Sequence, residues 1–91
     1  MKAKKSLGQN FLNNDKILSE IVDNGQISNN DVILEIGPGT GNLTEKIISK
    51  NPKQIILVEK DKNLVEVLRE KFGKRVTLIN KDILDCYKEF R

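Results

Sequence analysis

The sequence predicts an α/β fold, the Rossmann-like first half of a doubly wound sheet, with parallel strands in the order 3-2-1 and flanking helices. Apolar segments of strand length alternate with amphipathic segments of helical period. The strands are expected at 31–36, 55–59 and 76–80, and the helices at 42–50 and 62–72. Short connections between them favour β-α-β-α-β with right-handed crossovers. A glycine-rich segment after the first strand is the third observation, and since no further strand follows, the predicted sheet is incomplete.

Local signals place the ends of the helices. Asn14 or Asp15 can cap a helix that runs to about Asn24, where Gly25 ends it. Asp61 is a good N-cap for the helix at 62–72, with Gly73 as its stop, and the helix at 42–50 ends before Pro52.

The first two strands are both expected to be buried. Residues 31–34 are the start of a buried strand, and Ile55-Ile56-Leu57-Val58 is a continuous apolar run that suits a parallel strand covered on both faces.

The glycine-rich segment is Glu35-Ile36-Gly37-Pro38-Gly39-Thr40-Gly41, between the first strand and its helix. Glycines at every second position allow a tight turn and a close approach of the backbone to a ligand, and a helix N-terminus attracts negative charge. A dinucleotide fingerprint would place its third small residue at position 42, which is asparagine. An acidic residue followed by G-x-G-x-G is instead similar to the first motif of S-adenosylmethionine-dependent methyltransferases. The alternative is a tight turn that binds nothing.

Two carboxylates follow the second and third strands, at the edge where parallel α/β sheets bind ligands. Glu59 ends the second strand and can accept hydrogen bonds from both hydroxyls of a ribose. Asp82 follows the third strand and could accept a hydrogen bond from the exocyclic amine of adenine, with Ile83 as an apolar wall for the ring. With Gly37, Gly39 and Gly41 they form the candidate cofactor-binding set; the alternative for each carboxylate is a solvated strand end.

Composition limits the class of protein. Ninety-one residues with 37% hydrophobic and 32% charged residues fit one small globular domain. No apolar run approaches the roughly 20 residues of a membrane span, and no signal peptide is evident, so a cytoplasmic location without membrane partners is expected. One cysteine, Cys86, and no histidine exclude an internal disulfide and a convincing transition-metal site.

The start of the chain is basic. The net charge of +3 equals the charge of Lys2, Lys4 and Lys5, and the first acid is Asp15. Residues 1–13 could therefore neutralise a few phosphates, or could simply be a solvated terminus.

Two motifs together resemble one family. Gly8-Gln9-Asn10-Phe11-Leu12, followed by the glycine-rich segment, is similar to the rRNA adenine dimethyltransferases, which methylate the exocyclic amine of adenines with S-adenosylmethionine. The resemblance runs from about Lys5 to Asp82. It implies that Asn10 and Leu12 line the cofactor site, with Gln9 beside them and Gly37 at the methionine end. It also implies that Glu59 holds the ribose and that Asp82 holds the adenine.

The resemblance also implies a substrate. Gly8 and Thr40 look more like the small-subunit branch than the macrolide-resistance branch that acts on large-subunit rRNA. Small-subunit rRNA, or the pre-ribosomal small subunit, is therefore the expected partner in ribosome biogenesis. The alternatives are a large-subunit enzyme, a methyltransferase for a small molecule, and a non-catalytic binding module.

The sequence departs from the family pattern at its end. The family holds the target adenine with an N-L-P-Y type motif after the fourth strand, and the chain ends at Arg91 before any such motif. We therefore expect residues 1–91 to be an N-terminal part of the methyltransferase domain, with a motif-bearing arm at 1–13 and no catalytic residue of its own. Isolated, it should not transfer methyl groups, because orientation of the target base is lost. It should also self-associate through the edge of the first strand, which lacks the lysine, proline or bulge that protects natural edges.

Overall fold

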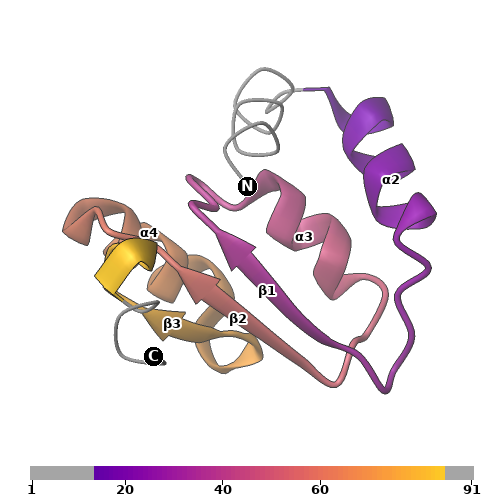
Figure 1. Ribbon diagram of the computed structural model, residues 1–91. Coiled ribbons are helices and arrows are strands. Elements are labelled where there is room, and N and C mark those ends of the chain that lie inside the picture. The colour runs from indigo at the N-terminus through magenta and orange to yellow at the C-terminus, as the bar shows by residue number, and fades with distance from the viewer. Residues whose placement is uncertain (1–13, 86–91) are drawn as a thin grey trace.

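A computed structural model describes residues 14–85 of the chain. It contains one parallel sheet of three strands in the order β1-β2-β3, as the sequence predicts. Figure 1 shows the strands side by side, with α2 next to α3 and α4 following β2. The elements are α2 (Asp15–Asn24), β1 (Val32–Ile36), α3 (Asn42–Ile48), β2 (Gln54–Val58), α4 (Lys62–Phe72), a 3-10 turn η1 (Gly73–Arg75) and β3 (Thr77–Ile79).

The helices cover one face of the sheet. The register pairs Ile33 with Ile55 and Leu57 with Leu78, so these apolar side chains point to the same face. The core contains them together with buried side chains from all three helices. Those helical residues are Val22 of α2, Ile47 of α3, and Leu68 and Phe72 of α4.

Both predicted N-caps are confirmed. The side chain of Asn14 accepts a hydrogen bond from the backbone N–H of Ile17 at 3.0 Å. The Asp61 carboxylate accepts from Asn63 at 2.8 Å and from Leu64 at 3.3 Å. Each bond satisfies a backbone donor that the first turn of a helix leaves unpaired.

The predicted boundaries of several elements were wrong by one or two residues. The helix after the glycine-rich segment ends at Ile48 and not at residue 50. At this end, the Ser49 hydroxyl donates a hydrogen bond to the Lys46 carbonyl at 2.6 Å. Strand β1 starts one residue later than expected, β2 is shifted by one residue toward the N-terminus, and β3 is shorter by one residue at each end. Ends of this kind depend on single hydrogen bonds that a hydrophobic pattern does not encode.

The expectation that β1 is a buried strand was wrong for one of its faces. Val32 and Leu34 are 53% and 54% exposed, whereas Ile33 between them packs against the core. Because side chains alternate along a strand, Val32 and Leu34 point away from the helices. Within residues 14–85 nothing covers this face of β1, and β2 is its one neighbouring strand.

The exposed face of β1 leads to a prediction about self-association. Substitution of Val32 and Leu34 by lysine should reduce association of the chain at high concentration, since charge on an edge strand opposes pairing with another copy. Sedimentation or light scattering over a concentration series measures the effect. Val67→Lys is a matched control, because Val67 is 43% exposed but lies on α4. A wild-type chain that stays monomeric at all concentrations would contradict the prediction.

Two groups of predictions lie outside the described residues. These are the arm at 1–13, with Gln9, Asn10 and Leu12, and the C-terminal segment 86–91, with Cys86. In the part of the chain that the structure describes, no helix has the length and apolarity needed to cross a membrane.

Candidate functional site

An open cavity of about 50 Å³ lies at the carboxyl ends of the three strands. It brings together four residues that the sequence analysis selected from three separate loops: Gly37, Glu59, Asp82 and Ile83. The rest of its lining is Ile36, Val58, Lys60 and Lys81. Ligand pockets typically enclose roughly 300–1,000 Å³, so these residues form part of a wall and do not enclose a ligand by themselves.

Glu59 is held where β2 meets the glycine-rich segment. Glu59 is only 5% exposed. Its carboxylate accepts hydrogen bonds from the Gly39 N–H at 3.4 Å and from the Asp61 N–H at 3.0 Å. A carboxylate has about four acceptor positions, so two remain after these bonds. Glu59 is thus a positioned hydrogen-bond acceptor in the wall of the cavity.

Asn80 was missed by the sequence analysis. Its side-chain amide donates to the backbone carbonyls of Glu59 at 2.9 Å and Lys60 at 3.3 Å. These bonds tie the end of β3 to the end of β2 and therefore fix the backbone that carries the Glu59 carboxylate. The available signal was an amide side chain directly after the third strand.

Asp82 begins a helical turn at residues 83–85. Its Oδ1 accepts from the Leu84 N–H at 3.0 Å, and its backbone carbonyl accepts from Asp85 at 2.9 Å. Asp82 and Ile83 are both half-buried and both line the cavity beside Glu59. The carboxylate and the apolar side chain are therefore adjacent in the wall of the cavity.

The glycines of the loop differ in their surroundings. Gly39 has φ of +62°, and a Cβ built there meets nothing within 4 Å. Gly41 has φ of +88°, and a Cβ there would lie 2.5 Å from the Phe72 ring. Open space at Gly39 leaves room for a ligand, whereas Gly41 lets the loop pack closely on α4. Contact of Gly41 with a cofactor stays a prediction.

Glu35, the acid of the glycine-rich motif, lies beneath the loop. The Thr44 hydroxyl donates to its Oε1 at 2.6 Å, and Thr44 itself is fully buried. Burial raises the pKa of the Glu35 carboxyl from 4.5 to about 7, and the hydrogen bond from Thr44 offsets part of that effect. Glu35 therefore links β1 to α3 and favours the protonated form in the folded chain.

The raised pKa of Glu35 predicts a pH dependence of stability. The contribution of Glu35 to the free energy of unfolding is fully present below about pH 4.5, where the carboxyl is protonated in the folded and the unfolded chain. This contribution is lost as the pH rises through about 7. The loss is on the order of 3 kcal/mol for a shift of this size. Urea unfolding of the wild type and of Glu35→Gln at pH 4.5, 6 and 7.5 measures it. The difference in unfolding free energy between the two proteins should shift in favour of the glutamine variant as the pH rises. A difference that does not change with pH would contradict the raised pKa of Glu35.

None of the predicted site residues lines a larger cavity that residues 14–85 form elsewhere. A second cavity, of about 210 Å³, lies around the start of β2 and is lined by residues such as Asn51, Lys53, Gln54 and Arg75. It is larger, but it lies at the opposite end of the strand from Glu59. Among residues 14–85, no group of three or more acidic, histidine or cysteine side chains could hold a metal ion.

A parallel sheet with a glycine loop after its first strand and carboxylates after the second and third defines a Rossmann-like methyltransferase fold. The comparison with solved structures agrees: the crystal structure of the 23S rRNA methyltransferase ErmE matches with a TM-score of 0.69 and 30% identity, over 76% of this chain and 29% of that chain. The family model for ribosomal RNA adenine dimethylase matches residues 1–89. The chain belongs to this family.

Curated relatives carry a more specific name. Ribosomal RNA small subunit methyltransferase A of Pelagibacter ubique is 54% identical over 84 residues, which is 92% of this chain and 32% of the relative. The protein of the same name from Sulfurihydrogenibium is 46% identical over 93% of this chain and 34% of its own length. The chain thus spans about a third of the length of these relatives.

Proposed function

We propose that the protein carrying this chain uses S-adenosylmethionine to dimethylate the exocyclic amine of adenines in small-subunit rRNA. Residues 1–91 would be the N-terminal part of its cofactor-binding domain. The observation that carries the proposal is the convergence of Gly37, Glu59, Asp82 and Ile83 on one cavity at the carboxyl edge of the sheet.

The residues present fit the adenosine part of this cofactor. The two remaining acceptor positions of Glu59 suit ribose hydroxyls, and Asp82 beside Ile83 suits an adenine ring. The open space at Gly39 admits a ligand above the loop. When bound, S-adenosylmethionine supplies an electrophilic methyl group. Gln9, Asn10 and Leu12 of the arm would complete the wall that residues 14–85 leave open.

The comparisons favour small-subunit rRNA as the substrate. The relatives named for the small subunit are 54% and 46% identical, whereas the solved 23S rRNA enzyme is 30% identical. The small-subunit rRNA or its precursor particle is then the partner, and a location with the assembling ribosome follows, which in a bacterium is the cytoplasm.

The test is methyl transfer by the full-length protein that contains this chain. Labelled S-adenosylmethionine is supplied with small-subunit and large-subunit rRNA, each naked and assembled, and the RNA is digested to nucleosides. Dimethyladenosine in small-subunit rRNA is the expected product. Label in large-subunit rRNA would instead support the resistance-type enzyme, and no transfer to any RNA would support a non-catalytic binding module.

A further inference from the structure

We propose that Lys71 is a positioning residue that holds the glycine loop in its binding shape. The proposal rests on the proposed function, because it concerns the same cofactor site. Lys71 lies on α4, 31 positions beyond the loop residue that it contacts. Lys71 is not among the residues that line the cavity, and its contact with the loop is to the Thr40 carbonyl, so it would act through the backbone of the loop.

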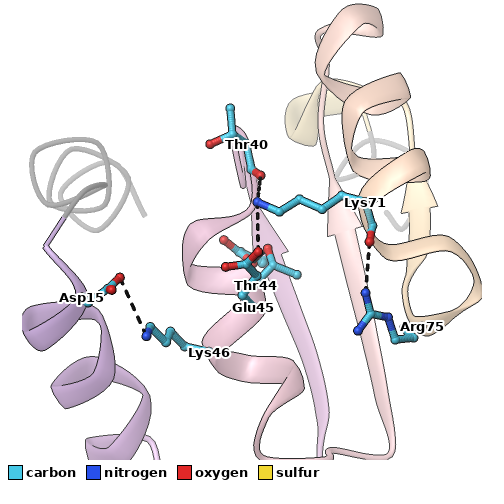
Figure 2. A network of polar contacts seen from close by, with 8 residues as sticks. Asp15, Thr40, Thr44, Glu45, Lys46, Lys71 and Arg75 are labelled. Carbon is cyan, nitrogen blue, oxygen red and sulfur yellow. Dashed lines mark hydrogen bonds and ion pairs between the residues drawn. The ribbon is translucent and has the colours of Figure 1, made fainter.

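The ammonium of Lys71 joins three elements (Figure 2). Its Nζ donates to the backbone carbonyl of Thr40 at 3.0 Å and pairs with Oε1 of Glu45, on α3, at 3.2 Å. It also lies 5.5 Å from the centre of the Phe72 ring. The loop, the helix that follows it and α4 are thus connected through one cation.

The Phe72 ring packs directly against the glycine loop at Gly41. It occupies the space that a side chain at position 41 would need, so the peptide between Thr40 and Gly41 lies directly against α4. Arg75 fixes this end of α4, because its guanidinium donates to the Lys71 carbonyl at 3.0 Å and to the Phe72 carbonyl at 3.2 Å. The stem of Lys71 therefore extends from a turn whose carbonyls are bonded by Arg75.

The loop is held from two sides by opposite charges. The Glu59 carboxylate accepts from the Gly39 N–H, and the Lys71 ammonium donates to the Thr40 carbonyl. Glycine peptides at positive φ rotate easily, since no side chain opposes the change. Two charge-assisted bonds on consecutive residues fix the peptide planes at the point where a ligand would approach.

The test compares Lys71→Met, which keeps the aliphatic stem but removes the donor, with Lys71→Arg, which keeps a donor. Lys74→Met is the matched control, because Lys74 is an exposed cation on the adjacent turn η1. Two quantities are measured in the full chain: hydrogen exchange at the Gly39 and Gly41 amides without ligand, and the Kd for S-adenosylmethionine. Thermal unfolding midpoints separate loosening of the loop from global loss of stability.

In Lys71→Met, exchange at both amides should speed up and the Kd should rise by about fivefold to tenfold, the effect of a partly exposed charged hydrogen bond. Lys71→Arg should stay within about twofold of the wild type, and Lys74→Met should be unchanged. If Lys71→Met unfolds, Lys71→Gln, whose amide is too short to reach Thr40, replaces it with the same expectation.

Unchanged exchange in Lys71→Met, or equal effects in Lys74→Met, would overturn the proposal. A wild-type chain that does not bind S-adenosylmethionine would contradict the proposed function. The exchange measurement would still decide whether Lys71 holds the loop.

Discussion

Replacement of Gly41 by alanine should lower the free energy of unfolding by about 2–5 kcal/mol. The left-handed conformation at φ of +88° costs a residue with a Cβ roughly 1–2 kcal/mol. The new methyl group would lie 2.5 Å from Cε2 and 2.7 Å from Cζ of the Phe72 ring, and overpacking of this kind costs about 1–3 kcal/mol. Urea unfolding followed by circular dichroism measures the loss.

Gly39→Ala separates the cost of the left-handed conformation from the cost of the clash with Phe72. Gly39 has φ of +62° but open space around its Cβ position, so only the conformational cost of about 1–2 kcal/mol should appear. Combining Gly41→Ala with Phe72→Leu should cost less than the sum of the single substitutions, because the smaller side chain relieves the clash. Additive effects would show that Phe72 is not the group that excludes a side chain at position 41.

Truncation of Glu59 to alanine should weaken binding of S-adenosylmethionine by about 1.5–3 kcal/mol, or roughly 10-fold to 150-fold in Kd. The carboxylate is the one acidic group at the end of β2 that is both buried and turned toward the cavity. Its removal would take away the proposed acceptor for two ribose hydroxyls and would leave the Gly39 and Asp61 amides without this partner. Isothermal titration calorimetry gives the Kd of each variant.

Two further variants interpret the Glu59 result. Glu59→Gln keeps the size of the side chain and one oxygen, so its loss should lie between the wild type and the alanine variant. Glu66→Ala removes an exposed carboxylate on α4 and should leave the Kd unchanged. Equal affinity of wild type and Glu59→Ala would remove the ribose assignment.

The sequence was sufficient to predict the order and type of the elements. Alternating apolar segments and glycine breaks encode strands and helices locally, and Asn14 and Asp61 encode helix starts through bonds to residues two or three positions away. The strand order followed from the short connections, since parallel neighbours with right-handed crossovers leave few alternatives. Half of the cavity lining could also be predicted, because parallel strands end at one edge of a sheet, whereas the predicted Gly39 and Gly41 do not line the cavity.

Other features depend on contacts between distant residues, and no local pattern predicts them. Lys71 meets Thr40 across 31 positions, and Asn80 meets Glu59 across 21. The close packing of Gly41 on Phe72 needs the placement of α4 against the loop, and the raised pKa of Glu35 needs the burial of its carboxyl in the folded chain. The expectation that β1 is buried was wrong on one face, because an apolar pattern does not say what covers a strand.

The central claim is that Gly37, Glu59, Asp82 and Ile83 line one S-adenosylmethionine site, in which Glu59, Asp82 and Ile83 hold the adenosine and Gly37 lies at the methionine end. Titration of S-adenosylmethionine into the isotopically labelled chain, followed by amide NMR, tests it most directly, because it also detects weak binding. Saturable shifts should concentrate at these residues and at Gly39, and the lining of the second cavity, including Asn51 and Gln54, should stay unchanged. Shifts centred on the second cavity, or no shifts at millimolar cofactor, would contradict the account.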